Sequence, residues 1–313
     1  MKPGENAAGR PRGERFKEIA SDLQAMSRGA TKAEAQQDPS AQKASAPEPP
    51  KINIPLAKSD NERARGLVEL DRKFVVDPAE MPPAASAYFR RRPFLTPEVC
   101  QKWRVGYLPR DVGGEDRSGG TMRGKVVYPF LSESGEVLTW FGRDPEYEEK
   151  HGKWVSGGKT EREPEKFHFV KGFHRGIEFW GQHVLRQDGV REKLQGLGLI
   201  VVEGPNDVIK LETLGVPAVG LCSNAITREQ AAKAATLARE VAGGIVTVFL
   251  DCDPEGETGM KQALGYLAQL VPVRLAWTGN MYGGKFKGRQ PESLKQEEWQ
   301  TIREWLTSAR ADG

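Results

Sequence analysis

The second half of the chain alternates short apolar runs with amphipathic segments. The apolar runs occupy residues 196–204, 216–224, 244–253 and 271–279. Between them, apolar residues recur at helical spacing in residues 206–215, 227–242 and 258–270. Nearly continuous apolar strands that alternate with helices are typical of a parallel sheet with right-handed crossovers. The pattern therefore predicts an α/β domain, followed by one more helix over residues 291–306.

The preceding segment has a different pattern. Residues 122–143 form two runs rich in β-branched and aromatic residues that are joined at SESGE, which predicts a β-hairpin. Upstream of the hairpin, Thr96 and Pro97 have the types favoured at the N-cap and first position of a helix. Residues 144–176 are rich in glycine and charge, which predicts irregular backbone. We therefore expect a smaller α+β subdomain before the parallel sheet.

The N-terminal segment differs from both. Residues 1–60 are rich in Ala, Pro, Gln, Ser and charged residues. Such a segment buries too little apolar surface to offset the entropy of ordering the chain, so we expect a disordered tail. We expect the upstream subdomain to span 61–190, the parallel-sheet domain 197–280, and a closing segment with a helix 281–313.

Composition narrows the class of protein. The 313 residues carry a net charge of only +3, so a surface that attracts nucleic acid must be local. The three cysteines form no CxxC pair, which argues against a zinc ribbon and favours a reducing, cytoplasmic environment. No apolar run reaches the roughly 18 residues of a membrane span, and the N-terminus lacks the apolar region of a secretory signal. We expect no zinc and no membrane association.

One stretch of the chain is locally basic. Between residues 90 and 125 cations outnumber acids and alternate with aromatic residues. Cations that bind phosphates and rings that stack on bases suit a single-stranded nucleic acid. The alternative is a solvated helix face over an ordinary aromatic core. The candidate nucleic-acid contacts in this stretch are Arg90, Arg91, Arg92 and Lys125.

Acidic residues stand at the ends of two predicted strands. Glu203 ends the first apolar run, and Asp251 and Asp253 end the third. Ligands of open α/β sheets lie beyond the carboxyl ends of the strands, so neighbouring strands would bring these carboxylates together. Their mutual repulsion favours a hard cation with oxygen ligands, Mg²⁺ or Mn²⁺. Each acid alone could instead cap a helix N-terminus. Gly204 and Gly256 would let the backbone approach a ligand closely.

The sequences EGPND at 203–207 and DCDPEG at 251–256 resemble the two motifs of the Toprim domain. That family includes bacterial primases, type IA and II topoisomerases, nucleases and small repair and RNA-maturation proteins. The resemblance implies metal-dependent work on nucleic-acid phosphodiesters. It implies Glu203, Asp251 and Asp253 as catalytic metal ligands, with Asp207 supporting a ligand or a second metal.

Three upstream stretches resemble the catalytic core of the bacterial (DnaG-type) primases: FRRRPFLTPEVCQKWRVGYLP, MRGKVVYPFLSESGEVLTWFGRD and EKFHFVKGFHRGIEFWGQ. The resemblance runs from about Ala87 to Trp305 and implies a primase-type subdomain beside the Toprim domain. The implied activity is nucleotidyl transfer that makes short RNA primers on a single-stranded DNA template from nucleoside triphosphates. The resemblance also implies cations that grip the triphosphate and the template, at Arg123, Arg143, Lys166 (with Lys153 as the alternative) and Lys171.

The chain departs from the primase pattern in two respects. Gln290-Pro291-Glu292 stands where that family has Asp-Pro-x-Asp, which predicts that the outermost metal site is weakened or lost. A zinc ribbon and a helicase-binding bundle are not recognisable, so we expect a stand-alone core from a mobile element or half of a split system. A replicative helicase or a separate zinc-binding initiator protein would then be a partner. A Toprim nuclease and a non-catalytic nucleic-acid-binding Toprim protein stay open as alternatives.

Overall fold

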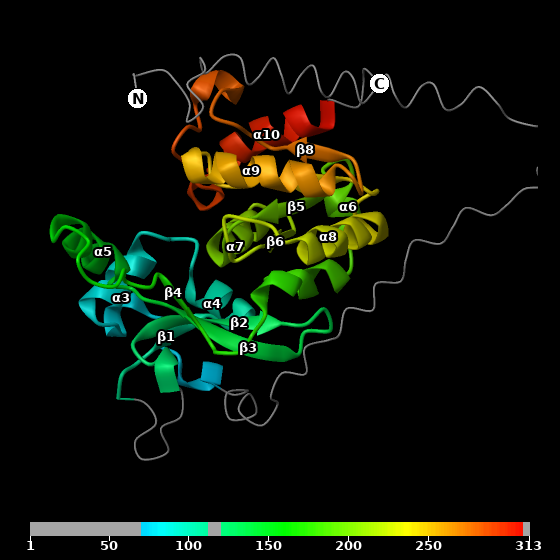
Figure 1. Ribbon diagram of the computed structural model, residues 1–313. Helices are drawn as coiled ribbons and strands as arrows, with labels where there is room; N and C mark the ends of the chain where they lie inside the picture. Colours follow the sequence, from blue (N-terminus) through cyan, green and yellow to red (C-terminus); the bar gives the residue numbers. More distant parts are fainter. Residues whose placement is uncertain (1–69, 112–119, 309–313) are drawn as a thin grey trace, which may run out of the picture. The chain divides into compact units, whose positions relative to one another are not determined.

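The structure is a computed structural model that describes residues 70–111 and 120–308. The expected tail at 1–60 lies outside these residues, and the expected domain boundaries stay predictions. The described residues all belong to one compact unit. They form two four-stranded sheets, one antiparallel and one parallel (Figure 1). The predicted combination of a parallel α/β sheet with a preceding α+β part is confirmed.

The N-terminal sheet is antiparallel, with the strand order β1-β2-β3-β4. Its strands are β1 (Gly106–Leu108), β2 (Lys125–Leu131), β3 (Val137–Arg143) and β4 (Phe167–Phe169). The predicted hairpin is the β2–β3 pair, in which Val126 lies opposite Arg143. Among the described residues, helices α3 (Pro83–Arg90) and α4 (Pro97–Trp103) precede the hairpin. As predicted, the Thr96 side chain caps α4, because its hydroxyl accepts from the backbone N–H of Val99 at 3.3 Å.

The prediction of irregular backbone over 144–176 was wrong in part. This segment contains helix α5 (Tyr147–Ser156) as well as β4. No residue of α5 is buried, so the helix has no apolar face that the sequence pattern could show. Ring contacts connect its successive turns. The ring centroids of Tyr147 and His151 lie 5.2 Å apart, and those of His151 and Trp154 lie 5.4 Å apart.

The parallel sheet has the strand order β6-β5-β7-β8. Its strands are β5 (Leu199–Val202), β6 (Ala218–Gly220), β7 (Val246–Val248) and β8 (Val273–Leu275). The connecting and closing helices are α7 (Pro205–Thr213), α8 (Arg228–Val241), α9 (Pro254–Leu267) and α10 (Gln296–Ser308). Strand and helix alternate as predicted, and all four β5 residues are buried, as expected of a central parallel strand.

Short helical turns connect these elements. A further α-helix is α6 (Val190–Leu194). The 3₁₀ turns are η1 (Leu70–Lys73), η2 (Pro78–Glu80), η4 (Gly120–Met122), η5 (Arg175–Ile177), η6 (Gln182–Arg186), η7 (Met281–Gly284) and η8 (Pro291–Ser293). Within 70–111 and 120–308, no helix combines the length and the apolar character needed to cross a membrane.

One continuous hydrophobic core joins the two sheets. It contains Tyr128 and Phe141 of the N-terminal sheet together with the whole of β5. Trp180 bridges the sheets: its backbone pairs with Gly220 at the end of β6, and its indole N–H donates to the carbonyl of Pro129 in β2 at 2.6 Å. Residues from both sheets can therefore hold fixed positions around one site.

Candidate active site

Two acids from neighbouring strands meet at the carboxyl edge of the parallel sheet. Strands β5 and β7 pair directly, with Val201 opposite Val248. Glu203 follows β5, and its carboxylate accepts a hydrogen bond from the backbone N–H of Asp251, after β7, at 3.0 Å. Both acids line a cavity of about 250 Å³. The convergence predicted from the strand ends is thus present for this pair.

The Asp251 carboxylate has one engaged and one orphaned oxygen. The residue is only 8% exposed. Its Oδ2 accepts from the Gln290 side-chain amide at 2.6 Å, whereas its Oδ1 is buried and has no hydrogen-bond partner among the described residues. A Cβ on Gly256 would lie 2.0 Å from the Asp251 carbonyl oxygen, so this close approach needs glycine. A buried carboxylate oxygen without a donor is costly, and it fits a site that binds a cation.

Asp253 occupies a different position from the other two acids. It is the N-cap of α9, because its Oδ1 accepts from the backbone N–H of Gly256 at 2.8 Å. One Asp253 oxygen therefore caps the helix, as the alternative interpretation predicted. Asp253 does not line the cavity. In the part of the chain that the structure describes, no three His, Cys, Asp or Glu side chains are grouped as a metal centre. Asp253 as a third ligand stays a prediction.

Asp207 is buried and both of its oxygens are engaged. Its Oδ2 accepts from the backbone N–H of Gly204, the N-cap of α7, at 2.9 Å. Its Oδ1 accepts from the backbone N–H of Glu292 in η8, also at 2.9 Å. Asp207 thus ties the first turn of α7 to the segment that follows Gln290, and it holds the cavity wall in place.

Burial disfavours the charged forms of the acids in the cavity. Burial, reinforced by the charge of Asp251, raises the pKa of Glu203 to about 8. Burial also raises the pKa of Asp251 to about 6, with the Gln290 hydrogen bond opposing the rise. For Asp207, burial and then the charge of Asp251 raise the pKa well above its usual value. A cation bound beside these carboxyl groups would stabilise their ionised form.

The lining of the cavity also contains cations and aromatic rings. Arg143 and Lys166 line the cavity together with Phe141, Phe167 and Phe169. The Arg143 side chain is buried, its guanidinium lies 5.6 Å from the Phe167 ring centroid, and it donates to the backbone carbonyl of Asp144. The exposed Lys166 lowers the pKa of both Glu203 and Asp251 by its charge. The aromatic lining was missed from the sequence, although alternation in EKFHF gave a strand signal.

Of the other predicted cations, one lines the cavity and five do not. Arg92 lines the cavity, where its guanidinium binds Glu292 through two contacts of 2.9 and 3.1 Å. Its template contact, like those of the others, stays a prediction. The predicted cations that do not line the cavity are Arg90, Arg91, Arg123, Lys125 and Lys171.

A closed ring of hydrogen bonds lies beside the acids. Tyr88 and Tyr128 hydroxyl oxygens lie 2.8 Å apart, Tyr128 donates to Asn206 Oδ1 at 3.0 Å, and Asn206 Nδ2 donates to Tyr88 at 2.7 Å. The three residues come from α3, β2 and α7, and Asn206 directly precedes Asp207. The ring therefore fastens the acid-bearing turn of α7 to the N-terminal sheet. Nothing in the sequence pattern indicated this contact.

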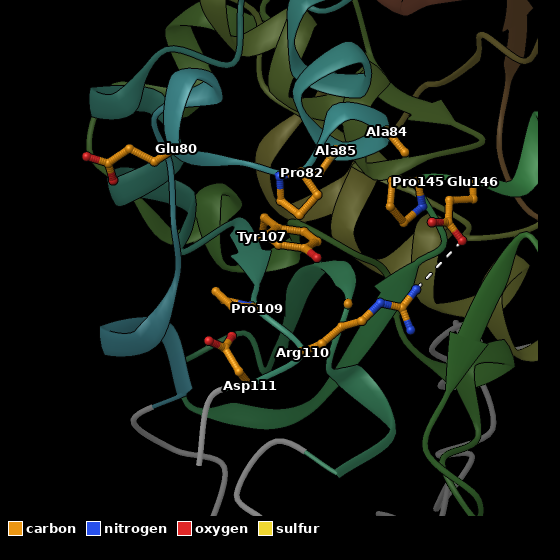
Figure 2. A pocket seen from close by; sticks show the side chains of 11 residues that line it. Glu80, Pro82, Ala84, Ala85, Tyr107, Pro109, Arg110, Asp111, Pro145 and Glu146 are labelled. Carbon is orange, nitrogen blue, oxygen red and sulfur yellow. Dashed lines mark ion pairs between the residues drawn. The ribbon is translucent and has the colours of Figure 1, made fainter. Parts of the chain in front are cut away.

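A larger cavity, of about 590 Å³, lies on the N-terminal subdomain (Figure 2). Pro82, Tyr107 and Pro109 line it, and Arg110 reaches across toward Glu146, with 3.6 Å between the charged groups. It contains none of the strand-end acids. Size alone would select this cavity, but the strand-end acids and the orphaned carboxylate oxygen of Asp251 select the smaller one.

Comparison with known proteins identifies the parallel-sheet region. Residues 198–276 match the family model for the Toprim domain. This match contains the strand-end acids at 203, 251 and 253, and it ends before Gln290. No curated protein matches the chain. The chain thus contains a Toprim domain, as the two motifs predicted.

Solved structures of bacterial primases share the fold of most of the chain. The zinc-binding and RNA polymerase domains of the Aquifex aeolicus primase align with a TM-score of 0.55 and 20% identity over 82% of this chain and 63% of that one. The E. coli primase catalytic core aligns with a TM-score of 0.53 and 18% identity over 78% and 80% of the two chains. The RNA polymerase domain of Mycobacterium tuberculosis primase, solved with a double-stranded DNA that has an overhang, aligns with a TM-score of 0.54 and 17% identity over 79% and 78%. The fold is that of a primase catalytic core.

Proposed function

We propose that this protein is a metal-dependent nucleotidyltransferase that synthesises short RNA primers on single-stranded DNA. The observation that carries the proposal is the cavity lined by Glu203 and Asp251, whose Oδ1 has no donor in the described residues, together with Arg143 and Lys166. Phosphoryl transfer needs this combination, because a divalent ion and fixed cations must together balance the charge of a triphosphate. The likeness of the fold to primase cores supports the choice of reaction.

Each wall of the cavity has a proposed task. Lys166 and Arg143 bind the triphosphate oxygens, and the buried, hydrogen-bonded setting of Arg143 orients it without help from substrate. Glu203 and Asp251, with Asp253 as the third proposed ligand, hold Mg²⁺ or Mn²⁺. When bound there, the ion supplies Lewis-acid neutralisation of the charge on the reacting phosphate. Asp207 keeps the turn that bears Glu203 in register through Gly204.

The template is proposed to follow the cations outside the cavity. Arg90 and Arg91 are exposed at the end of α3, next to Arg92, which borders the cavity. The DNA complex of the structurally similar Mycobacterium tuberculosis domain supports a nucleic-acid partner. A helicase partner, a separate zinc-binding initiator and a mobile-element origin stay predictions.

The deciding experiment is ribonucleotide incorporation on a single-stranded DNA template with Mg²⁺ and with Mn²⁺. Wild-type protein is expected to make short RNA products, and Asp251→Asn is expected to make none while still binding the template. Glu257→Gln, an exposed change in α9, serves as the control. Cleavage of the strand without synthesis would instead support a Toprim nuclease. Binding of the strand without either reaction would support a non-catalytic protein.

A further inference from the structure

We infer that the acid cluster takes one divalent cation and that Arg92 fills the place of a second. The cluster has two halves. The open half consists of Glu203 and Asp251, and the closed half consists of Asp207 and Glu292. The inference rests on the proposed function for the identity of the ion, but not for the number of ions bound.

Every carboxylate oxygen of the closed half already has a donor. Asp207 accepts from two backbone N–H groups, those of Gly204 and Glu292, each at 2.9 Å. Glu292 accepts from the Arg92 Nη2 at 2.9 Å and from the Arg92 Nε at 3.1 Å. A cation that approached here would meet these donors and the positive charge of the Arg92 guanidinium.

Arg92 is built into this position. Its side chain is 15% exposed, and its guanidinium lies 4.1 Å from the centroid of the Tyr88 ring. A guanidinium is always charged, and its planar fork matches a carboxylate through two parallel hydrogen bonds. Tyr88 is itself fixed by the hydrogen-bond ring with Tyr128 and Asn206. The closed half therefore carries its own positive charge, provided by the N-terminal subdomain.

The open half offers carboxylate ligands for one ion. Glu203 Oε1 and Asp251 Oδ2 are engaged, by the Asp251 backbone N–H and by the neutral Gln290 amide. The buried Asp251 Oδ1 has no partner in the described part of the chain. Mg²⁺ is commonly held by one or two carboxylates, with waters and substrate phosphates completing its six ligands. Glu203 and Asp251 can therefore supply the carboxylates for one ion.

The test counts bound Mn²⁺ on the full chain by electron paramagnetic resonance and titration calorimetry. Wild type is expected to bind one ion. Arg92→Ala frees the Glu292 carboxylate and is expected to bind two, whereas Arg92→Lys, which keeps the charge, is expected to bind one. Lys102→Ala is the matched control, since it also removes a cation paired with a Toprim-domain acid, Glu212, and it should still bind one.

Two bound ions in wild type, or one in a folded Arg92→Ala, would overturn the inference. Arg92→Met provides a second route if Arg92→Ala does not fold, because it keeps a long side chain over the Tyr88 ring and removes the charge; it is expected to bind two ions, and a count of one in this folded variant would also overturn the inference. A wild type that binds no Mn²⁺ would refute both this inference and the proposed metal dependence. One bound ion without primer synthesis would refute only the proposed function.

Discussion

The carboxylate of Glu203 accepts a hydrogen bond from the backbone N–H of Asp251 at 3.0 Å. This contact joins the ends of β5 and β7 and fixes one acid by the backbone that carries the other. An amide oxygen can accept the same bond, so Glu203→Gln removes charge without removing the contact. The two properties of this residue, structural and chemical, can therefore be separated.

We predict that Glu203→Gln retains the fold and loses primer synthesis. Charge stabilisation by a bound metal contributes several kcal/mol to such a transition state, so the loss should be about 100-fold or more. Circular dichroism and ribonucleotide incorporation would measure the two effects. Glu257→Gln, which is exposed, should retain activity. Unchanged activity in Glu203→Gln would remove the proposed ligand.

We predict opposite effects for two glycine substitutions in α9. Gly256→Ala places a Cβ 2.0 Å from the Asp251 carbonyl oxygen, so it should lower the free energy of unfolding by about 1–3 kcal/mol and displace the acid. Gly265→Ala meets open space and should stabilise the protein by about 0.5–1 kcal/mol. Urea denaturation would measure both. Equal effects of the two changes would contradict the close approach at Gly256.

The hydrogen-bond ring predicts a measurable coupling. Tyr128→Phe leaves the buried Asn206 Oδ1 without its donor and should cost about 1–3 kcal/mol of unfolding free energy. Asn206→Leu should cost a similar amount. The double variant should cost less than the sum, because both changes break the same bond. Strict additivity in urea denaturation would show that the two groups do not interact.

Reversal of two exposed charges should affect strand binding. We predict that Arg90→Glu with Arg91→Glu weakens binding to single-stranded DNA and lowers the salt dependence of log K by about 0.7 for each lost phosphate contact. Fluorescence anisotropy at several salt concentrations would give the slope. The control reverses Arg191 and Lys193, which are exposed on α6. Equal slopes in wild type and the Arg90/Arg91 variant would exclude a template path over α3.

The loop that carries Gln290 should respond to acid. Hydrogen bonds from Arg289 lower the pKa of Glu298 to about 2, from an ordinary value of 4.5. Because the folded pKa is depressed, the contribution is fully present above pH 4.5 and is lost as the pH falls toward 2. Glu298→Gln should therefore lower the Tm by a few degrees at pH 7 and by progressively less near pH 2. The exposed Glu297→Gln should show no such pH-dependent difference.

Much of the site could be predicted from local sequence. The apolar runs fixed the alternation of strands and helices, and parallel crossovers bring the ends of neighbouring strands to one edge. Glu203 and Asp251 were therefore predictable as a pair. Helix caps such as Thr96 and Asp253 were also predictable, because capping depends on residues only three positions apart. Helix α5 escaped prediction because its stabilising contacts are rings and charges rather than a buried apolar face.

Only the tertiary structure decided which carboxylate oxygens have a hydrogen-bond donor. Gln290 reaches Asp251 across 39 residues, and Arg92 reaches Glu292 across 200. The sequence identified these side chains, but periodicity carries no information on which distant donors meet them. These carboxylates are buried away from water. An oxygen that accepts a hydrogen bond is stabilised by its donor, whereas an oxygen without a donor is stabilised by a bound cation. The sequence alone determined where acids gather; long-range packing determined which oxygens remain able to bind.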